Sequence, residues 1–230
     1  MKIQGLQKTT LLDFPGKVAC TIFLAGCNFQ CPFCHNASLV THLNEENTLS
    51  EEEIFRFLKK RQGLLDGVCI TGGEPLLTGE VEAFIRRVKA MGYEVKIDTN
   101  GSNPDLLKHL VNEKLIDYVA MDLKNSKAKY KETAGKDFLS LELIDESVQF
   151  LLSDQVDYEF RTTVVREFHK REDFEEMGQW IKGAKRYYLQ QFVDSGDLIV
   201  PGLHAYAEDI LIQALRIVKK YVPEAAIRGI

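Results

Sequence analysis

The feature that most limits the fold of this 230-residue chain is a regular alternation of short β-rich runs with amphipathic helical patterns. The β-rich runs, which predict six strands, lie at residues 18–24, 68–71, 94–98, 118–123, 158–165 and 186–192. This alternation is typical of a parallel sheet with helical crossovers. Because six βα units are fewer than the eight of a complete barrel, we expect an α/β fold, an open, partial (β/α)6 barrel.

Signals for helix starts divide the chain in the same way. Ser50 and Glu53 form a capping box before one helical pattern, and Asn103 before Pro104 marks the start of another. Hydrophobic residues make up 45% of the chain, enough for one large core, and neither a linker nor a low-complexity run interrupts the pattern. We therefore expect a single domain over residues 1–230.

Polar motifs stand at the ends of the first four predicted strands. They are the cysteine loop at 27–34, Gly72-Gly73-Glu74-Pro75, Asp98-Thr99-Asn100-Gly101 and Asp122-Leu123-Lys124. Because the carboxyl ends of parallel strands meet at one mouth of a barrel, we expect these four motifs to form one site. The glycines would let a ligand approach the backbone closely, and the two aspartates could bind hydroxyls or a cation. Solvated acids at strand ends are the alternative.

The three cysteines of the loop, Cys27, Cys31 and Cys34, are spaced C-x3-C-x2-C. Three thiolates at this spacing can bind three irons of a [4Fe-4S] cubane and leave the fourth iron open. The other two, Cys20 and Cys69, lie inside apolar runs and are expected to be buried in strands. An odd number of cysteines argues against a complete disulfide framework.

Two other kinds of site remain open for these cysteines. A structural zinc ion would need a fourth ligand, for which His35 is the local candidate, but Cys34 and His35 are adjacent and cannot easily reach the same ion. Redox-active dithiols usually show C-x2-C, and Cys31 with Cys34 satisfies that spacing. The cluster explains all three cysteines, so it is our preferred interpretation.

Charge and hydropathy exclude some classes of partner. The formal net charge is −5, and the basic residues are interleaved with acids, so nucleic acid is not an expected partner. The N-terminal residues lack the apolar segment of a secretory signal, and no run of about 18 apolar residues is present to span a bilayer. We therefore expect a cytoplasmic protein that does not bind a membrane.

The segment from Cys27 through Cys31 and Cys34 to Asn36 resembles the cluster motif of the radical S-adenosylmethionine superfamily. The longer stretch that begins at Thr10 resembles the activating proteins of anaerobic ribonucleoside-triphosphate reductase. The Gly-Gly-Glu-Pro, Asp-Thr-Asn-Gly and Asp-Leu-Lys motifs resemble those of glycyl-radical activases. This resemblance covers the first half of the chain in register. It implies a partial barrel of the radical S-adenosylmethionine type.

The resemblance also implies roles for residues around the cysteines. S-adenosylmethionine would chelate the open iron, Phe33 would pack near its adenine, and Lys124 and Arg161 would neutralise its carboxylate. A monovalent cation beside the two aspartates is also implied, although Ala120 stands where a bulkier residue is expected. Loop packing and structural ion pairs are the alternatives. The expected cofactor-binding set is Phe33, His35, Gly72, Gly73, Glu74, Asp98, Asn100, Asp122, Lys124 and Arg161.

The function that the resemblance implies is removal of a hydrogen atom from one glycine of an anaerobic ribonucleotide reductase, a glycyl-radical enzyme. The electron would come from a donor such as flavodoxin. An alternative is the same cofactor chemistry on a small molecule, as in deazapurine biosynthesis. A non-catalytic metal-binding interaction protein is a third possibility, but such a scaffold needs neither the Gly-Gly-Glu-Pro motif nor the strand-end aspartates.

Overall fold

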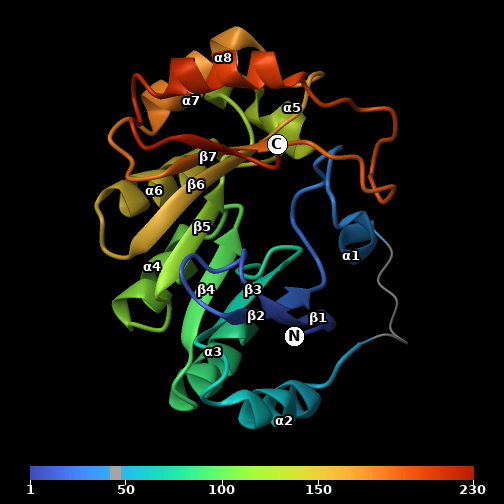
Figure 1. Cartoon of the computed structure of the whole chain (residues 1–230), viewed down its shortest axis with the longest axis vertical. Helices are drawn as coiled ribbons and strands as arrows, with labels where there is room; N and C mark the ends of the chain where they lie inside the picture. The colour runs from blue at the N-terminus through green and yellow to red at the C-terminus, as the bar shows by residue number, and fades with distance from the viewer. Residues whose placement is uncertain (42–47) are drawn as a thin grey trace.

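A computed structural model describes residues 1–41 and 48–230 and places eight strands in one sheet (Figure 1). The strands are β1 (Ile3–Thr10), β2 (Ala19–Leu24), β3 (Gly67–Gly72), β4 (Glu94–Thr99), β5 (Tyr118–Asp122), β6 (Asp157–Val164), β7 (Tyr187–Gln191) and β8 (Ala226–Arg228). The six predicted strands are β2 to β7, each within one residue at both ends. The prediction of these six strands is confirmed.

The strands lie side by side in chain order from β1 to β8. β1 pairs antiparallel with β2, and every other neighbouring pair is parallel. Among the strands that the structure describes, β1 and β8 are the two edges and do not pair with each other, so the sheet does not close. This arrangement confirms the open, partial barrel.

Neither edge strand was among the six predicted. In β1 the six residues between Ile3 and Thr10 are partly or fully exposed, so its sequence lacks a period-two apolar pattern, and its register with β2 is interrupted twice. The C-terminal tail forms β8, only three residues long, which adds to β7. Strands this short or this exposed carry too few apolar positions for a periodicity signal. The sheet therefore has two strands more than the six predicted.

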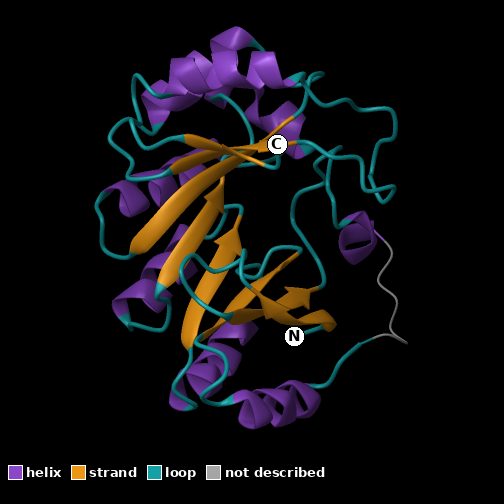
Figure 2. Ribbon diagram, viewed as in Figure 1, coloured by secondary structure: helices purple, strands orange, loops and turns teal. Residues whose placement is uncertain are grey.

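Helices connect successive parallel strands, and most of them lie along the outer side of the curved sheet (Figure 2). They are α1 (Ala37–Thr41), α2 (Glu51–Arg61), α3 (Glu80–Ala90), α4 (Pro104–Asn112), α5 (Tyr130–Ala134), α6 (Leu141–Leu152), α7 (Arg171–Trp180) and α8 (Glu208–Val218). The predicted capping box is present, because the Glu53 amide donates to Ser50 Oγ and the Ser50 amide donates to the Glu53 carboxylate. Asn103 caps α4 as predicted.

One large apolar cluster fills the space between the sheet and the helices. It includes residues of every parallel strand from β2 to β7 and of the helices that cross over between them. In the described part of the chain, no helix combines the length and the apolar character needed to cross a membrane. Because apolar side chains fill the space between the sheet and the helices, the polar groups lie at the carboxyl ends of the strands and on the loops there.

Candidate functional site

A cavity of about 400 Å³ lies at the carboxyl ends of the strands, and all four predicted motifs reach it. Its walls include the whole predicted set of Cys27, Cys31, Phe33, Cys34, His35, Gly72, Gly73, Glu74, Asp98, Asn100, Asp122, Lys124 and Arg161. The expectation that these residues converge on one mouth therefore agrees with the structure. The cavity is also lined by Gln7, Asp13 and Thr21, from the first two strands and their connection, which were not among the predicted site residues.

The cysteine loop follows β2 and is held by backbone hydrogen bonds from three other parts of the chain. The Gly26 amide donates to the Leu39 carbonyl at 2.9 Å, and the Gln30 amide donates to the Ala134 carbonyl at 3.0 Å. On the other side, the carbonyl of Pro32 accepts from an amide of the loop after β7 at 3.0 Å. These contacts fix the path of the loop without using any of the three thiols.

All five cysteines are free thiols. Burial raises the pKa of Cys27 to about 12 and that of Cys31 to about 11, and it also raises the pKa of Cys34. The metal-free thiols are therefore protonated at neutral pH, and metal binding would displace their protons. Cys20 and Cys69 are fully buried, as predicted.

The donors at the cavity suit an iron-sulfur cluster with one open iron. Three thiols line the cavity together, and three thiolates leave one iron of a cubane for another ligand. Within the described residues, no three His, Cys, Asp or Glu side chains are grouped as a site for a single metal ion. The three thiols are thus brought to one cavity without being closed around one ion.

Gly72 and Gly73 allow close approach between two strand ends, and the approach of a ligand to their backbone stays a prediction. A Cβ atom on Gly73 would lie 1.9 Å from the Gly26 carbonyl oxygen, and one on Gly72 would lie 2.4 Å from the Leu24 carbonyl oxygen. In that space the Gly73 amide donates to the Leu24 carbonyl and the Glu74 amide to the Gly26 carbonyl, both at 2.8 Å. These glycines therefore join the end of β3 to the root of the cysteine loop.

We expect Gly73→Ala to lower the free energy of unfolding by about 1 to 3 kcal/mol, because the added methyl group must push the cysteine loop away from β3. Gly79→Ala is the matched control, since a Cβ there meets nothing within 4 Å and its φ is −69°. Urea unfolding of both metal-free variants measures the difference. Equal stabilities would show that the close approach at Gly73 is not a constraint.

Glu74 is 3% exposed and already accepts three hydrogen bonds. Its donors are the Leu76 amide at 3.0 Å, the Thr99 hydroxyl at 2.7 Å and the Asn100 amide at 2.7 Å. Burial raises the pKa of Glu74 to about 7, although these three donors favour the charged form. Glu74 therefore ties the loop after β3 to the end of β4. Its role in cofactor binding stays a prediction.

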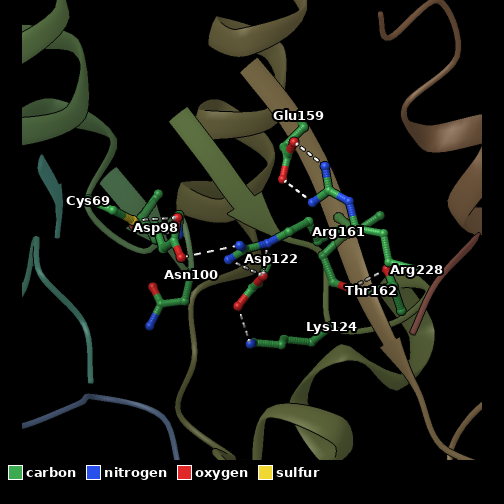
Figure 3. Close-up of polar contacts among 12 residues, drawn as sticks. Cys69, Asp98, Asn100, Asp122, Lys124, Glu159, Arg161, Thr162 and Arg228 are labelled. Carbon is green, nitrogen blue, oxygen red and sulfur yellow. Dashed lines mark hydrogen bonds and ion pairs between the residues drawn. The ribbon is translucent and has the colours of Figure 1, made fainter. Parts of the chain in front are cut away.

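The predicted acids and cations of β4, β5, β6 and the segment just after β5 form ion pairs with one another (Figure 3). Arg161 lies between the aspartates and donates to Asp98 Oδ2 at 3.2 Å and to Asp122 Oδ1 at 3.0 Å. Lys124 Nζ donates to Asp122 Oδ2 at 3.1 Å, and Lys96 pairs with Asp98 Oδ1. The acids are therefore not simply solvated, and both predicted cations have carboxylate partners.

These pairs determine the charge of the two acids. Burial by itself would raise the pKa of Asp122, but Arg161 and Lys124 outweigh it and hold that pKa at about 2. Burial opposes ionisation of Asp98 in the same way, and Arg161 and Lys96 outweigh it, so the pKa of Asp98 also lies below its ordinary value. Both carboxylates are charged at neutral pH.

The remaining predicted residues pack closely around the cysteine loop. The Phe33 ring is 5% exposed, and its centroid lies 5.8 Å from that of Phe168. The His35 ring stacks on Phe192 with centroids 5.6 Å apart, and burial lowers the pKa of His35. Asn100 Nδ2 donates to the Asn28 side-chain oxygen at 2.9 Å, next to Cys27. The contact of Phe33 with an adenine stays a prediction.

Two residues that the sequence analysis missed support these groups. His169 is fully buried, with Nε2 2.9 Å from the Lys124 carbonyl and Nδ1 3.1 Å from the Val165 amide, so it joins the segments after β5 and β6. No local motif marks it. Lys96 had a usable signal, because it stands two positions before Asp98 in a strand, and such residues point to the same face.

Comparisons with known proteins agree with this geometry. The model of the radical SAM superfamily matches residues 21–181. A Methanocaldococcus jannaschii protein, named as a glycyl-radical enzyme activating enzyme, is 35% identical over 99% of this chain and 96% of its own length. The 7-carboxy-7-deazaguanine synthase of Koribacter versatilis is 31% identical over 66% of this chain and 62% of that protein.

Solved structures share the fold. A domain of pyruvate-formate lyase-activating enzyme from Bacteroides vulgatus has a TM-score of 0.58 and 18% identity, covering 71% of this chain and 99% of that one. Streptococcus suis SuiB bound to S-adenosylmethionine has a TM-score of 0.70 and 15% identity, covering 91% of this chain and 52% of that one. The family match over residues 21–181 and the 35% identity with the activating enzyme over almost the whole chain show the family, and the three thiols lie in one cavity as that family requires. This chain is therefore an enzyme of the radical SAM superfamily, whose cofactors are a [4Fe-4S] cluster and S-adenosylmethionine.

Proposed function

We propose that this protein activates a glycyl-radical enzyme, specifically an anaerobic ribonucleoside-triphosphate reductase. The observation that carries the proposal is the cavity in which three thiols, the turn after β3 and the charged strand ends meet. Similarity to a named activating enzyme over almost the whole chain supports it. When bound and reduced by one electron, the cluster and S-adenosylmethionine supply methionine and a 5′-deoxyadenosyl radical, which can take a hydrogen atom from a glycine α-carbon.

The chain's own residues would hold and orient this chemistry. Cys27, Cys31 and Cys34 would bind three irons, and the cationic groups of Lys124 and Arg161 would face the carboxylate of the cofactor. These two side chains are 17% and 14% exposed, so they reach the cavity while remaining paired with acids. Low exposure weakens screening by water and strengthens their attraction for an anionic group.

The form of the mouth supports a protein substrate. The sheet does not close between β1 and β8 in the described residues, which leaves one side of the barrel unpaired. Leu77, Val193 and Val200 stand on loops that follow the carboxyl ends of β3 and β7, and they are 43%, 60% and 43% exposed. We take these exposed apolar side chains, on loops beyond the carboxyl ends of the strands, as candidate contacts for a partner protein.

The proposal is tested by incubating cluster-loaded, reduced protein with S-adenosylmethionine and an anaerobic ribonucleotide reductase from the same organism. We expect an electron paramagnetic resonance doublet from a glycyl radical on the reductase, together with 5′-deoxyadenosine. The doublet should vanish when the target glycine is replaced by alanine. An electron donor of the flavodoxin class should replace the chemical reductant. Cofactor cleavage without any radical on the reductase would contradict the proposed partner.

A second candidate is a radical reaction on a small molecule of the deazapurine class. The specific observation in its favour is the 31% identity with 7-carboxy-7-deazaguanine synthase over 155 residues. That match covers 66% of this chain, against 99% for the activating enzyme, so we place it second. Stimulation of cofactor cleavage by a small molecule of this class, with none by the reductase, would reverse the order.

A further inference from the structure

The charged groups at the wall of the cofactor cavity form one row of alternating sign. In order they are Lys96, Asp98, Arg161, Asp122 and Lys124. The first two are in β4, Arg161 is in β6, Asp122 is the last residue of β5, and Lys124 follows β5. Three cations and two anions leave the row with a net charge of +1. The row therefore already contains more positive than negative charge before any ion or cofactor binds.

Every carboxylate oxygen in this row faces a cationic nitrogen. Asp98 Oδ1 pairs with Lys96, and Asp98 Oδ2 accepts from Arg161 at 3.2 Å. Asp122 Oδ1 accepts from Arg161 at 3.0 Å, and Asp122 Oδ2 accepts from Lys124 at 3.1 Å. A hard metal cation needs several oxygen ligands, and here it would meet a positive group at each oxygen. The monovalent cation implied by the family resemblance does not fit this arrangement.

Lys96 is the residue that most clearly distinguishes this row from a metal-ion site, because its buried ammonium group already pairs with Asp98. Its side chain is 1% exposed, so the ammonium cannot exchange its carboxylate partner for water. The lysine stands in β4, which is paired on both sides, so its backbone is fixed. Within residues 1–41 and 48–230, its only other hydrogen-bond partner is the Cys69 thiol, 3.7 Å from Nζ. Lys96 does not line the cavity, whereas Asp98, Asp122, Lys124 and Arg161 do.

We propose that Lys96 is a built-in cation that neutralises Asp98 from behind the cavity wall, so that this protein binds S-adenosylmethionine without a monovalent metal ion. Lys96 is thus a positioning residue. With Asp98 neutralised, Arg161 remains available to attract the carboxylate of the cofactor. Without Lys96, Asp98 would compete for Arg161 and repel that carboxylate. The proposal concerns cofactor binding alone and holds for either candidate substrate.

The test measures the dissociation constant of S-adenosylmethionine for cluster-loaded protein, with no partner protein present. Titrations are run at equal ionic strength in sodium, potassium or choline chloride, the last supplying no metal cation. We expect the wild-type constant to differ by less than about twofold among the three salts, because ionic strength and not ion identity then governs binding. A wild-type affinity that is tenfold or more weaker in choline would overturn the proposal.

Lys96→Met keeps the volume and removes the charge. We expect its affinity in choline to fall by about tenfold, a change typical of losing one partly buried charge interaction, and to recover in sodium or potassium. Lys185→Met is the matched control, because Lys185 pairs with Asp154 on the surface at 48% exposure, and it should behave as wild type. Unchanged affinity of Lys96→Met in choline, or a loss that neither ion repairs, would contradict the proposal. If Lys96→Met fails to fold, the wild-type comparison still decides.

Discussion

Replacing any one of Cys27, Cys31 and Cys34 by alanine will abolish cluster binding, whereas the wild-type protein will hold about four irons per chain after anaerobic reconstitution. The reason is geometric. The three thiols line one cavity, and the other two cysteines are buried elsewhere and cannot replace a missing ligand. Iron and sulfide analysis, with the visible absorption of the cluster, measures the effect.

Cys20→Ala provides the matched control for the loss of a sulfur atom. Cys20 is fully buried and does not line the cavity, so its replacement should leave the iron content unchanged. We expect only a small cavity cost, on the order of 1 kcal/mol in the free energy of unfolding. Loss of iron in Cys20→Ala, with full iron content in the three loop variants, would show that the cluster lies elsewhere.

Arg161→Leu will lower the free energy of unfolding of the metal-free protein by about 3 to 5 kcal/mol at neutral pH. Arg161 is 14% exposed and is the one group in the row that bonds to both aspartates. Its removal leaves two neighbouring carboxylates with one lysine each and with less compensation for their burial. Urea unfolding of metal-free protein measures this effect without any contribution from cofactors.

The pH dependence of this effect has a defined sign. Arg161 helps to hold the pKa of Asp122 at about 2, below the ordinary value near 4, so the folded state gains stability from Asp122 above pH 4. That gain is lost as the pH falls from about 4 towards 2. The difference between wild type and Arg161→Leu should therefore narrow over that range.

Arg86→Leu is the surface control for this prediction. Arg86 also contacts two carboxylates, those of Glu82 and Glu113, but its side chain is 47% exposed. Water screens such pairs, so we expect a change of about 1 kcal/mol or less. If Arg161→Leu were no more destabilising than Arg86→Leu, the buried row would not be a stabilising element of the fold.

The sequence by itself determined the parallel strands, the helical crossovers and the strand ends at which the polar motifs stand. It could do so because side-chain periodicity is a local property of a strand or a helix. All thirteen predicted site residues line one cavity, since the carboxyl ends of parallel strands necessarily share one edge. The edge strands β1 and β8 were not predicted, because β1 is largely exposed and β8 is short.

Only the tertiary structure decided which partner each site residue has. Arg161 meets Asp98 across 63 positions of the chain, and the Asn100 amide meets Glu74 across 26. The sequence shows that these charges and donors exist, but their pairing depends on strand order, register and the direction of each side chain. The same is true of Gly73, which lies against the Gly26 backbone, and of Lys96, which forms an ion pair with Asp98. Such contacts join segments far apart in the chain, so no local pattern encodes them.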